Sequence, residues 1–300
     1  DFFIEYLIFC CSGIAYSIFN FFSAYFRAGL NFKIELHGYV LSNFILVIGL
    51  IFIENFFIMT TLNLAIIFFV ARLLPMIFSV YMFLADTRKM KFQLNLKDLT
   101  SELKKVLPIA AITILAFLYI YIDLFLIEFY LGFEEVGQYQ VAFRLIILTM
   151  IIPEIFNHLM LPFLSKLWKK DPINYFLTLR ISLIILFLYS IIATSLIAIF
   201  SKPVISLIFL DKYSISGEII LYMLPLIILR SLGAPLGLRL LIENLAYYRL
   251  FFMLLVTFFT IICNIIVIPM YGLYGVVFTS IIAHIILNAL YWSKLRRWRH

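Results

Sequence analysis

Long, uninterrupted apolar runs are the feature that most constrains this chain. About nine of them recur along the 300 residues, and each approaches the roughly 20 residues that an apolar helix needs to cross a bilayer. Sixty-five per cent of the residues are hydrophobic and 13% are charged, whereas a soluble domain is about half apolar and about a quarter charged. This composition excludes a soluble globular protein, and the 33 Phe and 18 Tyr exclude intrinsic disorder.

The apolar runs are continuous, whereas the strands of an outer-membrane barrel alternate apolar and polar side chains. We therefore predict an all-α membrane protein, a polytopic helical bundle of about nine transmembrane helices. The expected spans are about 2–25, 38–57, 61–84, 107–131, 138–163, 174–199, 218–240, 247–268 and 273–293. Residues 200–217 are expected to form a loop that contains a short apolar stretch.

Basic residues are distributed unevenly over the connections between these spans. Of the 23 Lys and Arg, 17 lie in one set of alternate connections and the C-terminal tail, and two, Lys202 and Lys212, lie in the opposite set. Because cytoplasmic loops carry the excess of Lys and Arg, we predict a cytoplasmic C-terminus and an Asp1 that faces outward. The net charge of +7 is thus an orientation signal, and we expect no nucleic-acid partner.

The longest and most basic cytoplasmic connection, 85–106, separates three spans from six. Within it, Asn95 can cap a helix, and apolar residues follow at helical spacing, which predicts a short amphipathic helix on the cytoplasmic membrane surface. If the parent protein has two six-helix lobes, three helices are missing before Asp1. We therefore interpret 1–84 as a partial N-terminal lobe, 85–106 as an inter-lobe linker and 107–300 as a C-terminal lobe.

Charged side chains within the spans are the candidate functional residues. Such a residue costs about 2.5–3.5 kcal/mol at the centre of a span, so it usually faces a bundle interior or a watery cavity. Arginine binds phosphate oxygens through two parallel hydrogen bonds, so several intramembrane arginines indicate an anionic substrate. The candidate substrate ligands are Arg72, Arg144, Arg180 and Arg230, and the candidate ion-pair or coupling residues are Asp123, Glu128 and Glu154.

A structural role for these charges is the alternative that the sequence leaves open. By depth in the membrane, Asp123 could meet Arg144, and Glu154 could meet Arg180. An arginine near the end of a span can also extend its guanidinium to the lipid headgroups.

Catalytic signatures are absent from the sequence. It contains no GxSxG, P-loop or HExxH motif, and its four histidines, at 37, 158, 284 and 300, are scattered. A sugar-transferring enzyme usually needs a substantial aqueous loop, and the connections between these spans are short. We therefore predict a transporter rather than an enzyme, with no cofactor and no metal site, and with H⁺ or Na⁺ left open as a coupling ion.

Several stretches resemble one family of membrane proteins, and together they cover most of the chain. They are FNFFSAYFRAGLNFKIE near the start, LPIAAITILAFLYIYIDLFLI at 107–127, GFEEVGQYQVAFRL at 132–145, PFLSKL at 162–167 and PMYGLYGVVFTS at 269–280. They resemble, in order, the exit of the fourth helix, the seventh helix, the turn after it, the end of the eighth helix and the turn before the last helix. The family is that of bacterial polysaccharide repeat-unit flippases (Wzx type), in the multidrug/oligosaccharidyl-lipid/polysaccharide exporter superfamily.

This resemblance implies a MATE-like fold of two six-helix lobes around a central cavity, here without the first three of twelve helices. It implies that undecaprenyl-pyrophosphate-linked oligosaccharide crosses the bacterial inner membrane by alternating access, for O-antigen and lipopolysaccharide synthesis. The four arginines would neutralise the pyrophosphate, and Asp123 would hold an arginine in one state. The expected partners are the lipid-linked oligosaccharide, membrane lipids, a polysaccharide polymerase and a chain-length regulator.

Three other functions remain open at this stage. The first is a cation-coupled multidrug exporter of the same superfamily, against which the arginines in the spans argue. The second is a membrane-embedded polymerase, ligase or acyltransferase of glycan assembly, and the third is an inactive truncated remnant.

Overall fold

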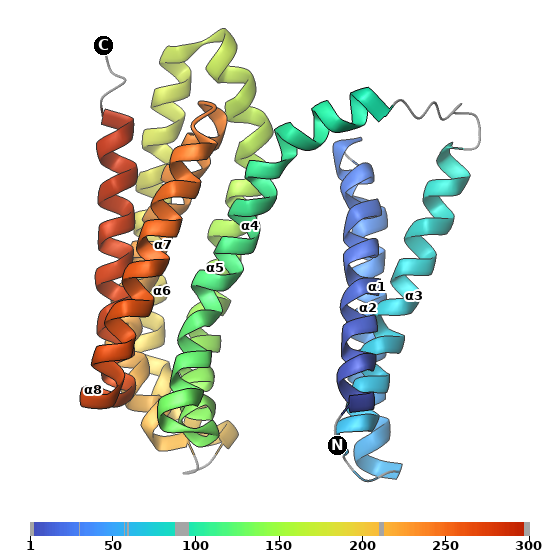
Figure 1. Ribbon diagram of the computed structural model, residues 1–300, viewed down its shortest axis with the longest axis vertical. Coiled ribbons are helices and arrows are strands. Elements are labelled where there is room, and N and C mark those ends of the chain that lie inside the picture. Colours follow the sequence, from blue (N-terminus) through green and yellow to red (C-terminus); the bar gives the residue numbers. More distant parts are fainter. Residues whose placement is uncertain are drawn as a thin grey trace. The chain divides into compact units, whose positions relative to one another are not determined.

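The computed structural model describes residues 3–29, 31–56, 58, 60–87, 96–209 and 213–296, and within these ranges the protein is entirely helical. All eight helices found there are long and apolar enough to cross a membrane. The chain divides into two compact units, Asp1–Leu94 and Asn95–His300 (Figure 1). The division falls inside the connection predicted at 85–106.

The N-terminal unit contains α1 (Phe3–Ala28), α2 (Phe32–Phe56) and α3 (Thr61–Thr87). Helix α3 packs against both other helices. The Ser12 hydroxyl of α1 donates a hydrogen bond to the backbone carbonyl of Phe68 in α3 at 3.2 Å. Gly38 lets α2 approach α1 closely, because any side-chain carbon there would overlap the ring of the buried Phe19.

The C-terminal unit contains the other five helices, with α7 at its centre. Helix α7 packs against α5, α6 and α8, and α4 packs against α5 and α8. The bounds are α4 (Leu96–Leu131), α5 (Phe133–Lys170), α6 (Pro172–Phe209), α7 (Ser214–Ile242) and α8 (Ala246–Arg296).

Helix α8 makes two passes along the unit. Its 51 residues would span roughly 75 Å as a straight helix, more than twice the thickness of a hydrocarbon core. Gly272 interrupts it with φ 57° and ψ −140°, a backbone conformation that favours glycine. The ribbon reverses direction at this point (Figure 1). The eight helices therefore provide nine membrane-crossing segments, as predicted.

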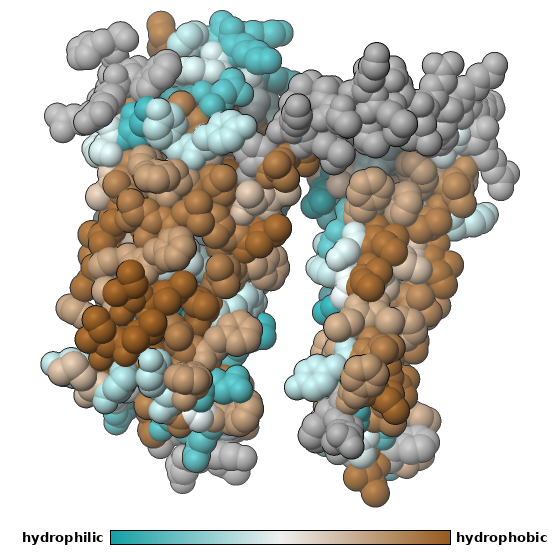
Figure 2. Space-filling view, in the orientation of Figure 1, coloured by the Kyte–Doolittle hydropathy of each residue, from teal (hydrophilic) through white to brown (hydrophobic). Residues whose placement is uncertain are grey.

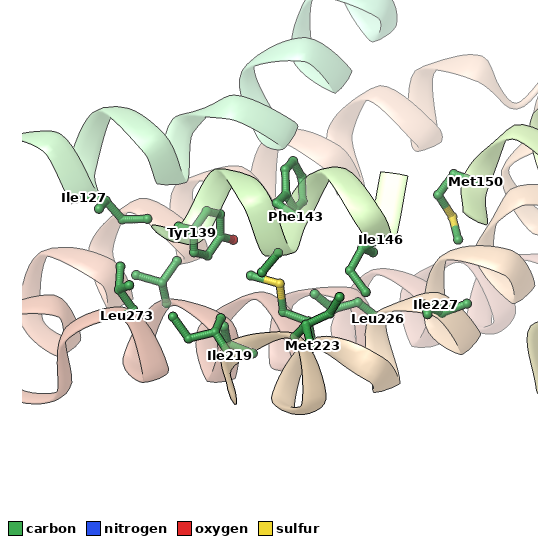
Figure 3. Close-up of a cluster of buried hydrophobic side chains, with 14 of the residues drawn as sticks. Ile127, Tyr139, Phe143, Ile146, Met150, Ile219, Met223, Leu226, Ile227 and Leu273 are labelled. Atoms are coloured by element: carbon green, nitrogen blue, oxygen red, sulfur yellow. The ribbon is translucent and has the colours of Figure 1, made fainter. Parts of the chain in front are cut away.

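The core of the C-terminal unit joins all five of its helices, with Ala193 as the buried contribution of α6. Tyr139, Phe143, Ile146 and Met150 of α5 recur at helical spacing and present one apolar face. That face meets α4, α7 and α8 residues that include Ile127, Ile219, Met223, Leu226, Ile227 and Leu273 (Figure 3). These contacts fix the rotation of each helix, and with it the direction in which its polar side chains point.

The outer surface of this unit is apolar over a broad band, and polar side chains gather at its two ends (Figure 2). Many large hydrophobic side chains are exposed, such as Phe129 at 80% and Ile192 at 59%. Exposed apolar surface of this extent is expected where lipid, not water, surrounds the protein. The chain is a multi-pass membrane protein.

Two helices extend beyond their predicted spans. Residues 200–209 were expected in a loop, but α6 continues to Phe209, because Ser201 and Ile205 are buried one turn apart. The predicted surface helix belongs to α4, which runs without a break from Leu96 to Leu131, while its proposed cap Asn95 lies outside the described residues.

A well-formed cap separates α5 from α6. The Asp171 carboxylate accepts a hydrogen bond from the backbone N–H of Asn174 at 3.1 Å, and Pro172 occupies the first helical position, where a missing N–H costs nothing. The hydrogen bonds from Asn174 hold the pKa of the Asp171 carboxyl below its ordinary value. This sharp turn brings α6 back antiparallel to α5.

Candidate functional site

Asp123 of α4 is a buried carboxylate that three side chains from two other helices hold in place. Asn264 donates a hydrogen bond to Oδ1 at 2.7 Å, and Ser280 donates one to Oδ2 at 2.8 Å. The Tyr139 hydroxyl lies 3.4 Å from the same Oδ2. The two α8 partners come from opposite sides of the Gly272 reversal, so the folding back of α8 builds this site.

A second set of hydrogen bonds runs from Ser280 through His284 to Arg230. The backbone carbonyl of Ser280 lies 2.8 Å from His284 Nδ1, and the Tyr119 hydroxyl lies 3.0 Å from the same nitrogen. Arg230 Nε donates to His284 Nε2 at 3.1 Å. Because arginine can only donate, Nε2 must be the accepting nitrogen, and the imidazole is neutral with its proton on Nδ1.

Arg230 therefore sits at the end of a chain of contacts that starts at Asp123. Its guanidinium lies over the Phe143 ring, 5.2 Å from the centroid, and the charge of Asp123 attracts it. Among the described residues, neither terminal nitrogen of Arg230 has a hydrogen-bond partner. The edge of the guanidinium that forms a two-point contact with phosphate is thus available.

A cavity of about 240 Å³ lies between α4, α5, α7 and α8, and Arg230 forms part of its wall. The charged lining residues are Arg230, Arg249 and Glu154. With both arginines protonated and the glutamate ionised, these side chains give the cavity wall a net charge of +1. Its neutral polar lining includes Tyr119, His284, Asn288 and Tyr291. A cavity with guanidinium groups and hydrogen-bonding side chains in a membrane protein suits an anionic, hydroxyl-bearing ligand.

Small residues on α7 keep this cavity open. Gly233, Ala234 and Gly237 line it together. A Cβ at Gly233 would lie 2.5 Å from Oδ1 of Asn288, whose Nδ2 donates to the Leu229 carbonyl at 2.8 Å. Glycine at this position allows α8 to place a polar amide against the α7 backbone.

Three of the seven predicted site residues meet in this part of the protein. Arg230 and Glu154 line the cavity, and Asp123 connects to it through Ser280 and His284. Arg72 belongs to the N-terminal unit, where its guanidinium lies 4.8 Å from the Tyr16 ring centroid and 5.7 Å from that of Phe68.

Neither of the two ion pairs that depth suggested, Asp123 with Arg144 and Glu154 with Arg180, is present among the described residues. Arg144, Arg180 and Glu128 are exposed, and none of them lines the cavity. Arg144 follows the buried Phe143 and so turns away from the core, while Asp123 faces α8. Matching depth in the membrane did not identify partners, because helix rotation decides which side chains meet.

Sequence reasoning missed several residues of the site. Asn264, Ser280 and His284 were not singled out, and Arg249 was counted only as a charge in a connection. A signal was present, since Ser280, His284 and Asn288 recur every four residues in an otherwise apolar segment and therefore share one helix face.

Solved structures of membrane proteins share this fold at low sequence identity. A MATE transporter of Vibrio cholerae (VcmN, mutant form) superposes with a TM-score of 0.74 and 16% identity, over 98% of this chain and 70% of the other. The lipid II flippase MurJ in an inward closed conformation gives a TM-score of 0.71 and 19% identity, over 95% of this chain and 59% of the other. At these identities the similarity concerns the fold, which is MATE-like.

The sequence comparisons place the chain in a family. No protein with a curated description matches it significantly. The model of a family described as polysaccharide biosynthesis protein matches residues 7–218, which is more than two thirds of the chain. The match starts within the first two turns of α1, covers α2 to α6 completely and ends in the first turn or so of α7, and it includes Asp123 and Glu154. This chain, with its MATE-like fold, belongs to the polysaccharide biosynthesis protein family.

Proposed function

We propose that this protein is a flippase that moves undecaprenyl-pyrophosphate-linked oligosaccharide repeat units across the bacterial inner membrane. The observation that carries the proposal is the cavity in the C-terminal unit, where Arg230 has an unpaired guanidinium edge among the described residues. Family membership links the chain to polysaccharide synthesis, and its fold is one that a lipid II flippase also has.

The physical problem for such a flippase is the diphosphate group. An uncompensated charge at the bilayer centre is costly, and a guanidinium in a low-dielectric cavity offsets that cost through charge-assisted hydrogen bonds. The neutral polar side chains of the cavity can accept and donate hydrogen bonds to sugar hydroxyls. Binding of the diphosphate also competes with the attraction of Asp123 for Arg230, which would connect substrate binding to the buried network.

In this proposal the protein works by alternating access, and Asp123 is the coupling residue. The Asp123 carboxylate accepts two short hydrogen bonds from neutral donors. When it binds H⁺ or Na⁺, its negative charge is neutralised and it no longer attracts Arg230. The C-terminus lies in the cytoplasm, and a polysaccharide polymerase and a chain-length regulator act on the product. The protein transports its substrate and catalyses no chemical step.

Deletion of the gene in its native strain tests this proposal. We expect loss of surface polysaccharide, accumulation of lipid-linked repeat units on the cytoplasmic side, and full recovery when the natural full-length protein is expressed. The surface glycan is measured by immunoblot, and drug susceptibility is measured in the same strains. An unchanged glycan combined with increased sensitivity to drugs would contradict the proposal and favour a multidrug exporter.

A further inference from the structure

Arg249, in the first turn of α8, has a half-buried side chain whose hydrogen-bonding partners are neutral groups. Its Nη1 makes a long contact of 3.4 Å with the Gly237 carbonyl, and its Nε is buried without a partner among the described residues. The guanidinium lies directly over Gly237, where a Cβ would be 3.4 Å from both Cζ and Nε. A buried donor on a cationic group is costly without an acceptor, so this position favours a strong acceptor from outside the chain.

Among the described residues, no carboxylate forms an ion pair with Arg249. Glu243 is held by Arg239 and by the Tyr175 hydroxyl, which donates to it at 3.1 Å. Glu154 lines the same cavity but forms no ion pair with Arg249 within the part of the chain that the structure describes. The Tyr291 hydroxyl is a neutral hydrogen-bonding partner of Arg249. Nearby, Lys294 places its Nζ 3.5 Å from the Tyr248 ring centroid, which adds positive charge at this end of the protein.

Arg230 and Arg249 are anchored at two different levels of one cavity. Measured along α8, Arg230 contacts His284 and Arg249 contacts Tyr291. Measured along α7, Arg230 is itself residue 230, and the guanidinium of Arg249 lies over Gly237. Both comparisons give a separation of seven residues, which corresponds to about 10 Å of helix. The two anchoring levels are therefore offset along the helices, and each guanidinium can hold a phosphate group at its own level.

We propose that Arg249 forms an inner-end subsite that receives the diphosphate of a lipid-linked substrate before Arg230 does. The inference rests on the proposed function, because it assigns an order of contacts to the same cavity. Arg249 lies near the predicted cytoplasmic end of the span, and Arg230 lies in the middle of α7. The ligand chemistry is the phosphate oxygens of a diphosphate, which two-point contacts with a guanidinium suit.

Binding measurements on the purified full chain in lipid nanodiscs test the subsite. The probes are inorganic diphosphate and undecaprenyl diphosphate, in nanodiscs of neutral lipid and in nanodiscs that contain phosphatidylglycerol. The variants are Arg249→Gln, Arg249→Lys and Arg230→Gln, and Lys169→Gln is the control, because it removes one exposed positive charge at the inner end of α5. The melting temperature without ligand checks that each variant folds.

We expect Arg249→Gln to weaken the binding of both diphosphates by about tenfold or more, as the loss of a charge-assisted hydrogen bond implies. Arg249→Lys, which keeps the charge and is less disruptive to the fold, should lose affinity to a smaller extent, and Lys169→Gln should bind as the wild type does. Wild-type affinity in Arg249→Gln would overturn the subsite and leave the proposed function intact.

Two other results would overturn the diphosphate subsite at Arg249, and each would identify a different reason. If the wild type bound phosphatidylglycerol at Arg249 but neither diphosphate, the residue would be a site for membrane lipid headgroups. If neither the wild type nor Arg230→Gln bound inorganic diphosphate or undecaprenyl diphosphate, the proposed function itself would be contradicted.

Discussion

Replacing Asp123 with alanine should abolish transport and destabilise the C-terminal unit by about 3 kcal/mol or more. The substitution leaves the donors of Asn264 and Ser280 without an acceptor, and it removes the charge that attracts Arg230. Removing one member of a buried charge network is strongly destabilising, because the remaining polar groups stay buried and unpaired. Transport is measured by recovery of the surface glycan, and stability by thermal unfolding in detergent.

The Asp123→Asn variant distinguishes an effect on folding from an effect on transport. The amide has the same shape and keeps one accepting oxygen, so the protein should fold, but without a charge to exchange it should transport at most a few per cent of the wild-type amount. Glu134→Gln is the control, because Glu134 is an exposed acid in the first turn of α5. Normal transport by Asp123→Asn would show that the carboxylate is structural and not coupled to the cycle.

Replacing Arg230 with glutamine should reduce transport by about a hundredfold. Glutamine can still donate a hydrogen bond to His284, but it has no positive charge to bind a phosphate. It also removes the positive charge that attracts the Asp123 carboxylate. The loss of one or two charge-assisted hydrogen bonds, at about 1.5–3 kcal/mol each, gives this magnitude. Arg230→Lys should recover only part of the activity, since lysine keeps the charge but not the planar two-point geometry.

Variants of His284 show whether the position of Arg230 matters as well as its charge. His284→Gln can still accept a hydrogen bond from Arg230 Nε, so it should keep a substantial part of the transport rate. His284→Leu cannot accept one, so it should resemble the Arg230 variants while its protein level stays normal. Equal activity of the two His284 variants would contradict the positioning role. Initial transport rates over a range of substrate concentrations provide the comparison.

The spans could be predicted from the sequence because the bilayer imposes one length on every apolar run. The reversal inside α8 was also predicted, since the span ending at 268 and the span starting at 273 flank Pro269 and Gly272. The end of α6 was not predicted correctly. Lys202 and Pro203 indicate a loop, whereas the burial of Ile205 holds the segment in the helix.

The site was harder to predict than the spans, because charge is a conspicuous signal and neutral polar residues are not. Asp123, Glu154 and Arg230 were identified as charges inside spans, but their partners Asn264, Ser280 and His284 were not. Depth along the membrane can be read from the sequence, whereas the rotation of each helix depends on packing such as that of Phe143 against α7. Arg249 was missed for a related reason, since its position near a span end hides that it points into the cavity.

Transport by the purified protein in proteoliposomes shows whether it moves lipid-linked oligosaccharide between leaflets. The natural full-length protein is placed in proteoliposomes that carry a fluorescent undecaprenyl-pyrophosphate-linked oligosaccharide, and the fraction that moves to the other leaflet is followed by quenching from outside. We expect movement that requires the protein, that depends on an H⁺ or Na⁺ gradient, and that is lost in Arg230→Gln. Movement of the lipid-linked oligosaccharide no faster than in protein-free liposomes, by a folded protein under either gradient, would contradict the proposed function.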